Sequence, residues 1–215
     1  MDKYFMAFVN GSKLPSRDFS SYALICFFVS CVLGLIASII SVAANFLVAL
    51  ASFRFLGFTQ GICLVSGLAL VFTLVRWRSV IRQLHRKMAE KFPNYAAIAL
   101  KMDETMVNLG IAIAAAGLII NLFVVFGFVV VVVGLALAYH FFFKSMKDFE
   151  GEEAKFLSSI VNKEMRSFNF SLDTNTLLYM MITLFGYAIL HQEDWFNAVE
   201  DYVNKRRALL EEVTK

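Results

Sequence analysis

The sequence predicts an all-α integral membrane protein with two transmembrane helical hairpins, about four membrane helices in all, followed by a C-terminal helical domain. Of the 215 residues, 59% are hydrophobic and 17% are charged, whereas a typical soluble domain has about 45–50% and about 25%. Most of the hydrophobic residues fall in two blocks, residues 22–75 and 107–143. Each block has room for a hairpin, because one crossing needs roughly 17–25 residues.

The first block predicts a hairpin over residues 22–75. Residues 1–21 are polar and are expected to form a cytoplasmic N-terminal segment. Residues 22–51 then contain no charge, and this run is too long for the core of a cleaved signal peptide, so we expect an uncleaved helix that tilts or projects beyond the bilayer. Residues 55–75 fit one further crossing, and a connection at residues 52–54 completes the hairpin.

The basic segment at residues 76–106 predicts the topology. It contains seven basic and three acidic residues, and short loops rich in Lys and Arg stay on the cytoplasmic side. We therefore expect both termini and this segment inside, and the hairpin tip outside. The basic side chains are expected to contact anionic lipid head groups or a protein partner, with docking on the C-terminal domain as an alternative. They are Arg76, Arg78, Arg82, Arg86, Lys87 and Lys91.

The second block, residues 107–143, predicts another hairpin. As a single helix its 37 residues would measure about 55 Å, against a hydrocarbon core of roughly 30 Å. A turn at Asn121 or at residues 126–128 explains the length, and Lys144 and Lys147 then mark the return to the cytoplasm. The alternative is one long helix that ends outside, which would leave the basic residues of the tail on the wrong face.

The tail, residues 144–215, predicts a helical domain that is cytoplasmic or lies on the membrane surface. Residues 176–190 are apolar but number only 15, a length between that of a buried core helix and that of a membrane helix. We expect a core helix there, with a fifth crossing as the alternative. The last helix carries an apolar face that is expected to mediate contacts. This face consists of Trp195, Phe196, Val199 and Tyr202.

Small residues recur in the apolar blocks at spacings of about four, which let helices approach closely in lipid. We expect them to pack the hairpins internally, and the alternative is contact between copies in a homo-oligomer. The candidate helix-packing residues are Ser30, Gly34, Ser38, Gly57, Gly61, Gly134 and Ala138.

The sequence holds no recognisable constellation for catalysis, a cofactor or a metal, so we expect a protein that is not an enzyme. The cysteines lie inside predicted membrane helices, and the histidines have no metal-site spacing. Paired carboxylates such as Glu152 and Glu153 lie outside the apolar blocks and are expected to be solvated. The first three predicted membrane helices contain no charged residue, and the fourth has only His140 at its edge, which disfavours a proton-coupled carrier. The basic segment is short and tied to the bilayer, so no nucleic-acid binding is expected.

In size and layout the chain resembles the entry-exclusion proteins of conjugative plasmids. The resemblance covers the two apolar blocks, the basic residues 76–101 and the tail 144–215, without a diagnostic motif, so no functional residue is carried over. It implies a multi-pass protein of the bacterial inner membrane that blocks redundant conjugative DNA transfer by recognising a component of the incoming machine. Phage superinfection-exclusion and bacteriocin immunity proteins share this layout. An oligomeric membrane pore or effector, and a scaffold subunit of a secretion or conjugation system, are the alternatives.

Overall fold

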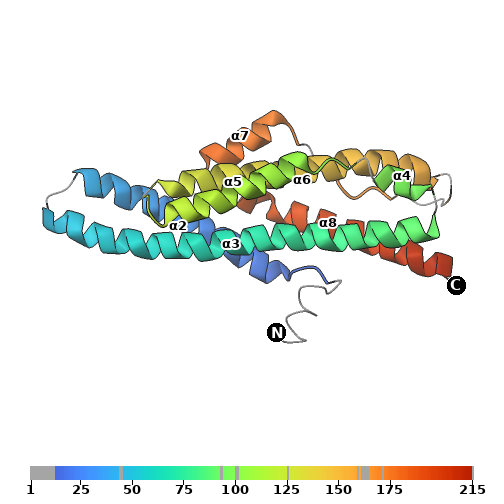
Figure 1. The fold of residues 1–215 in the computed structure, drawn as a ribbon, viewed down its shortest axis with the longest axis horizontal. Coiled ribbons are helices and arrows are strands. Elements are labelled where there is room, and N and C mark those ends of the chain that lie inside the picture. The colour runs from blue at the N-terminus through green and yellow to red at the C-terminus, as the bar shows by residue number, and fades with distance from the viewer. Residues whose placement is uncertain are drawn as a thin grey trace.

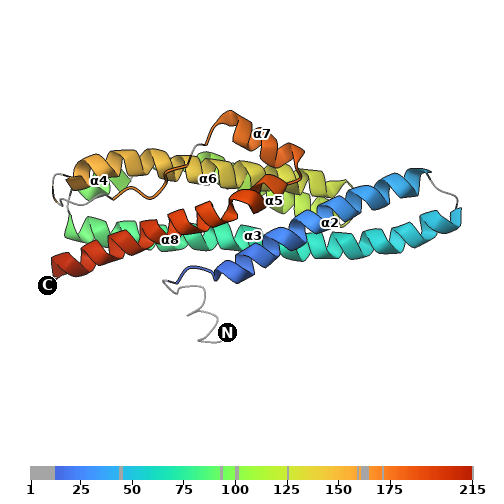
Figure 2. The same ribbon diagram turned by 180° about the vertical axis from the view of Figure 1, so that it is seen from behind.

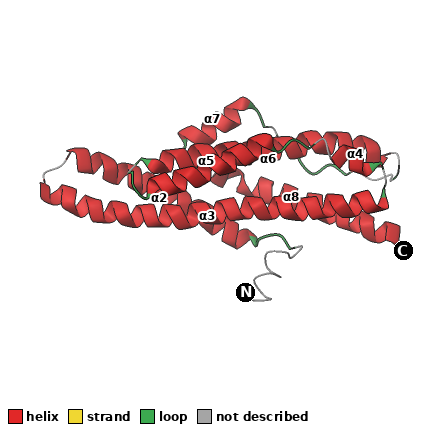
Figure 3. Ribbon diagram, in the orientation of Figure 1, coloured by secondary structure: helices red, strands yellow, loops and turns green. Residues whose placement is uncertain are grey.

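A computed structural model of the chain consists of helices and their connections, with no strand among the described residues (Figure 3). The described residues are 13–43, 46–92, 94–99, 102–124, 126–158, 160, 165–170 and 172–214. Most of the expected N-terminal cytoplasmic segment lies outside these ranges. The helices are α2 (Arg17–Ala43), α3 (Phe46–Lys91), α4 (Tyr95–Ala99), α5 (Thr105–Asn121), α6 (Gly127–Ser158), α7 (Thr174–Ile182) and α8 (Gly186–Thr214).

Two pairs of consecutive helices form the frame of the molecule. Helix α2 lies beside α3, and α5 lies beside α6 (Figure 1). Helix α8 lies on the side turned to the viewer in Figure 2, where it contacts α2 and follows the second half of α3. One continuous cluster of buried residues joins α2, α3, α5, α6 and α8. The tail therefore packs into the same core as the hydrophobic blocks instead of forming a separate body.

The expectation of an all-helical membrane protein is confirmed at this level. Three described helical segments are long and apolar enough to cross a bilayer, and Thr105–Asn121 is apolar but shorter. The three segments are Arg17–Ile40, Phe55–Lys91 and Gly127–Leu157.

Helix boundaries differ from the limits of the apolar blocks. Helix α3 continues without a break across residues 75 and 76, and α6 continues past residue 143 to Ser158. Neither junction contains a glycine or proline that would break the helix. The change from apolar to charged side chains therefore changes the polarity of the helix surface, while the backbone stays helical. Residues 107–143 are divided between two helices, since α5 ends at Asn121 and α6 begins at Gly127.

Residues 176–190 do not form the single core helix that we expected. Helix α7 ends at Ile182, and the chain turns through Leu184 and Phe185, whose φ angles are 51° and 72°. Such left-handed conformations cost about 1–3 kcal/mol at a residue other than glycine. The Phe185 ring is fully buried, against Phe27 and Tyr139, and this burial offsets the strain. At nine residues, α7 is about 14 Å long, too short to span a bilayer.

Glycines bring α5 and α6 unusually close together. A Cβ atom added to Gly134 would lie 2.2 Å from the backbone nitrogen of Ala114, and one added to Gly110 would lie 2.4 Å from that of Ala138. Gly117 makes a similar contact with Val131, at 2.6 Å. The expected packing residues Gly134 and Ala138 thus face partners on α5 that the spacing analysis did not include.

The other expected packing residues have different surroundings. Ser30 and Ser38 are buried, and their hydroxyls donate to carbonyl oxygens within α2. A Cβ atom on Gly34 would lie 3.7 Å from the Thr59 hydroxyl of α3. At Gly57 and Gly61, by contrast, an added Cβ would meet no described atom within 4 Å. These two glycines are open to the surroundings of the molecule.

Candidate functional site

The surface of the molecule is divided into an apolar part and a polar part. Exposed large hydrophobic side chains occur on α2, on residues 55–75 of α3, on α5 and the turn that follows it, and on α7, and they include Val129 at the start of α6 and Leu190 near the start of α8. Ile160, just beyond the end of α6, is exposed as well. Within the described chain, none is exposed in residues 76–99, 130–157 or 191–212. Apart from Ile160, the exposed large apolar side chains form a belt around one part of the bundle. The remaining part, which we call the polar end, has a mostly polar, water-compatible surface.

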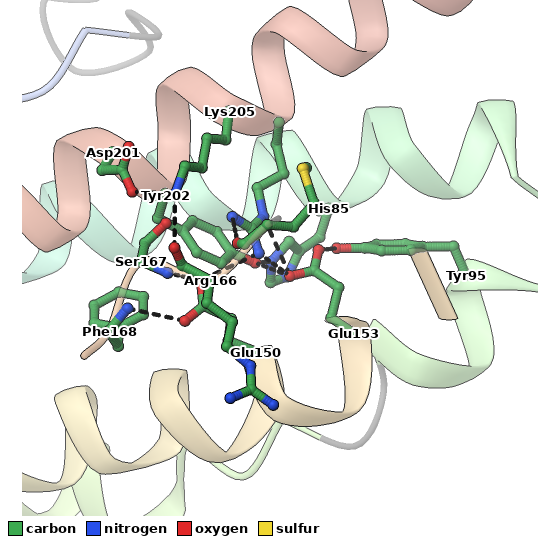
Figure 4. Close-up of polar contacts among 12 residues, drawn as sticks. His85, Tyr95, Glu150, Glu153, Arg166, Ser167, Phe168, Asp201, Tyr202 and Lys205 are labelled. Atoms are coloured by element: carbon green, nitrogen blue, oxygen red, sulfur yellow. Dashed lines mark hydrogen bonds and ion pairs between the residues drawn. The ribbon is translucent and has the colours of Figure 1, made fainter. Parts of the chain in front are cut away.

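A network of ionisable side chains lies buried at the polar end, where α3, α4, α6 and α8 meet (Figure 4). Each member is at most 6% exposed. The members are His85, Tyr95, Glu150, Glu153, Tyr202 and Arg206.

Arg206 of α8 is the centre of this network. Its Nη2 atom lies 2.5 Å from Glu153 Oε2 and 3.3 Å from Glu150 Oε1, and its Nη1 donates to the Met165 carbonyl at 2.8 Å. The guanidinium also stacks on the Tyr202 ring, 3.7 Å from its centroid. One cation therefore neutralises charge from two carboxylates and fixes the segment around residue 165.

Both glutamates of the network also accept hydrogen bonds from uncharged donors. Glu150 accepts from the backbone nitrogens of Ser167 and Phe168, at 2.7 and 2.9 Å. Glu153 accepts from the Tyr95 hydroxyl at 2.5 Å and from the Tyr202 hydroxyl at 3.2 Å. These bonds supply the buried carboxylate oxygens with hydrogen-bond partners in place of water. The network therefore ties four helices and the 165–170 segment together.

The two tyrosines of the network stay protonated and its arginine stays charged around neutral pH. Loss of solvent raises the pKa of Tyr95 and Tyr202 well above the usual range, so both phenols stay protonated and able to donate. Burial by itself lowers the pKa of Arg206, but attraction to the Glu153 and Glu150 carboxylates outweighs it and raises the pKa on balance. The network is therefore suited to hold the packed helices together, and not to exchange protons near neutral pH.

Glu153 corrects the expectation that the paired carboxylates are solvated. Its side chain is fully buried, whereas that of neighbouring Glu152 is exposed. Glu153 follows Phe149 by four residues and precedes Leu157 by four, so all three share one helix face. This spacing is the signal that could have revealed its burial.

The expected interaction face of the tail lies inside the protein. Trp195, Phe196, Val199 and Tyr202 are all at most 9% exposed. The Trp195 ring packs 4.9 Å from that of Phe143, centroid to centroid. These side chains hold α8 against α3 and α6, and they are not accessible to a partner.

The six basic candidates of α3 divide into two groups. Arg76 and Arg78 are buried, and they bind the Lys13 carbonyl and the Glu104 carboxylate, respectively. Arg82 is exposed and also pairs with Glu104. The remaining three, Arg86, Lys87 and Lys91, are exposed. Part of the basic segment is thus used to hold the start of α5, and the rest lies on the surface.

We expect the change Glu104→Gln to lower the free energy of unfolding by about 1–3 kcal/mol, because the buried Arg78 guanidinium loses its counter-ion. Denaturation in detergent, followed by circular dichroism, measures this change. Glu90→Gln, at an exposed position of α3, is the matched control. Equal stability of the two variants would contradict the anchoring role of Glu104.

A charged ridge runs along the exposed side of α6. We call it the α6 ridge; it consists of Lys144, Lys147, Asp148, Glu152 and Lys155. Grooves of about 330 and 560 Å³ border it, one next to the start of α5 and the other next to the 165–170 segment. Gly151 lies within the ridge, and an added Cβ would meet no described atom within 4 Å there. Internal packing therefore does not require this glycine, although a mid-helix glycine costs about 0.5–1 kcal/mol relative to alanine.

Metal-binding chemistry finds no support among the described residues, where no group of three or more His, Cys, Asp or Glu side chains is placed to hold an ion. All three cysteines are free thiols. Buried polar atoms without a described partner include Nδ1 of His140 and Oδ1 of Asn121.

No known protein family matches the chain, and neither a curated protein nor a solved structure shows significant similarity to it. Functional inference therefore depends on the physical properties of the chain itself.

Proposed function

We propose that this chain is a bacterial inner-membrane protein of the exclusion or immunity type, which recognises a protein partner and catalyses no reaction. The observation that carries the proposal is the division of the surface into an apolar belt and a polar end. Such a division suits a protein that is anchored by its helices and presents the polar end to one aqueous compartment.

The proposed topology places the polar end in the cytoplasm. Arg86, Lys87 and Lys91 are exposed there, and basic residues next to membrane helices are retained inside. Both hairpins, α2–α3 and α5–α6, then enter the bilayer from the cytoplasmic side and return to it. The C-terminus follows α8 and is cytoplasmic as well.

The α6 ridge is the proposed recognition surface. It combines charges of both signs with two bordering grooves, and the buried network directly beneath it fixes its backbone. A preformed, rigid surface lowers the entropic cost of binding. Gly151 leaves a low point in the ridge at which the backbone of a partner can approach closely. The proposed partner is a membrane-associated component of the incoming conjugation machine.

Self-association is the second candidate property, and Gly57 and Gly61 favour it. Their open face on α3 carries a small-xxx-small pattern that permits close helix contact in lipid. A homo-oligomer built on this face is compatible with the proposed exclusion function and also with an oligomeric membrane effector.

Conjugation assays test the exclusion function. Recipient cells that express the chain are expected to receive fewer plasmids from matched donors than recipients with an empty vector. The Gly151→Trp variant fills the low point of the ridge and is expected to restore transfer, whereas Asn204→Trp, at an exposed position of α8, is expected to leave exclusion intact. Unchanged transfer across several plasmid groups would refute exclusion. Equal behaviour of the two tryptophan variants would refute the role of the ridge.

A further inference from the structure

The α5–α6 hairpin stops well before the end of the α2–α3 hairpin. At its tip, the Asn121 side-chain amide donates to the Gln60 carbonyl of α3 at 3.4 Å, and Leu118 lies against Gly67. These contacts place the tip level with Gln60. Helix α3 begins at Phe46, so it extends about 21 Å beyond that level. The same overhang of α2 and α3 is visible in Figure 1.

The α5–α6 turn is apolar throughout its described residues. Leu122, Phe123, Val124 and Phe126 are 50–82% exposed, and Phe123 is the most exposed of them. Asn121, the polar residue next to them, is only 1% exposed and points into the bundle. A turn that faces water normally has the opposite arrangement, with polar side chains outward. The surface of this tip fits acyl chains better than water.

Backbone hydrogen bonding of the turn also suits a medium without water. An unpaired backbone group in hydrocarbon costs several kcal/mol. The nitrogens of Leu122, Phe123 and Val124 donate to carbonyls of Ile119 or Ile120 at 2.8–3.1 Å, and Gly127 donates to Val124 at 2.9 Å. These donors are therefore satisfied within the hairpin itself.

Two charged positions on either side of the tip set its depth. Glu104, paired with Arg78, marks the cytoplasmic boundary, and the 17 residues from there to Asn121 rise about 26 Å, less than a hydrocarbon core of roughly 30 Å. On the far side of the tip, Arg54 lies six residues before Gln60 in α3. Along the helix axis this is about 9 Å beyond the level of Gln60. A charged residue favours the head-group region, so the far boundary lies beyond the tip.

We propose that α5–α6 is a re-entrant hairpin whose turn, described at residues 122–124 and 126, ends among the acyl chains of the outer leaflet. Only α2–α3 reaches the outer surface. This inference rests on the proposed topology and replaces the expectation of two complete crossings by the second apolar block. The partner of this apolar tip is the lipid hydrocarbon.

Cysteine accessibility tests the inference. The native Cys26, Cys31 and Cys63 are replaced by alanine, and single cysteines are introduced by Phe123→Cys and by Ala43→Cys, both at exposed positions. Intact spheroplasts are treated with a membrane-impermeant maleimide. We expect Ala43→Cys to be labelled in intact spheroplasts and Phe123→Cys to stay unlabelled until detergent is added. Labelling of Phe123→Cys from outside as fast as Ala43→Cys would overturn the inference.

Two further measurements separate the ways in which the inference can fail. If Ala43→Cys is not labelled from outside, the proposed topology fails, independently of the hairpin depth. A spin label at Phe123→Cys or Val124→Cys, in phosphatidylethanolamine–phosphatidylglycerol liposomes, reports depth directly. We expect frequent collisions with oxygen and a loss of collisions with a water-soluble nickel chelate. Collisions dominated by the chelate at both positions would overturn the inference.

Discussion

The change Arg206→Met is expected to lower the free energy of unfolding by about 3–5 kcal/mol, because it leaves two buried carboxylates without their cation. Glu150 and Glu153 are at most 3% exposed, so water cannot replace the guanidinium. Titration of the purified protein with a denaturing detergent, followed by circular dichroism, measures the loss.

A matched control and a compensating variant make this prediction specific. Lys205→Met removes the neighbouring cation, which at the surface pairs with Asp201 and donates to the Arg166 carbonyl, and should cost about 1 kcal/mol. Combining Arg206→Met with Glu153→Gln removes the carboxylate nearest to the lost cation and is expected to recover part of the lost stability, whereas Glu150 keeps its two backbone donors. If Arg206→Met is no less stable than Lys205→Met, the network does not hold the polar end together.

The membrane character of the fold could be predicted from the sequence because it depends on long runs without charge. Such runs, as in residues 22–51, have few alternatives to a membrane helix. The ends of the helices were less predictable. Neither residue 76 nor residue 144 interrupts its helix, since polarity and backbone conformation are separate properties of a residue.

The buried network could not be predicted as a unit, because its members come from four helices that are distant in sequence. Local signals nevertheless existed. Glu153 lies on the apolar face of Phe149 and Leu157, and Arg206 follows Tyr202 by four residues. A charge in such a position can be a solvated residue at the edge of the face or a buried one with a partner. The choice depends on tertiary contacts that one sequence does not contain.

The apolar face of the tail was predicted from the sequence, but the surface that covers it was not. The apolar stripe of Trp195 and Phe196 was visible in the sequence, but the stripe does not state which surface covers it. In the structure α3 and α6 cover it, through rings such as Trp77 and Phe143. An apolar helix face usually packs against a complementary helix of the same chain when one is present.

Gly134→Leu is expected to lower the free energy of unfolding by about 3 kcal/mol or more, at or above the usual range for overpacking. The Cβ atom alone would lie 2.2 Å from the Ala114 nitrogen. That neighbour is backbone, so a side-chain rotation cannot relieve the clash and α5 must move away from α6. The same detergent titration measures the effect.

Gly57→Leu is the matched control, because an added Cβ there meets no described atom within 4 Å. We expect its free energy of unfolding to stay within about 0.5 kcal/mol of the unmodified protein. Equal destabilisation by both variants would refute the close α5–α6 contact.

The Gly57→Leu variant also tests self-association, since light scattering in mild detergent measures the mass of the complex. A Gly57→Leu protein that is stable but has lost self-association would assign the open face of α3 to a second copy of the chain, because leucine at that position blocks close helix approach without disturbing the fold.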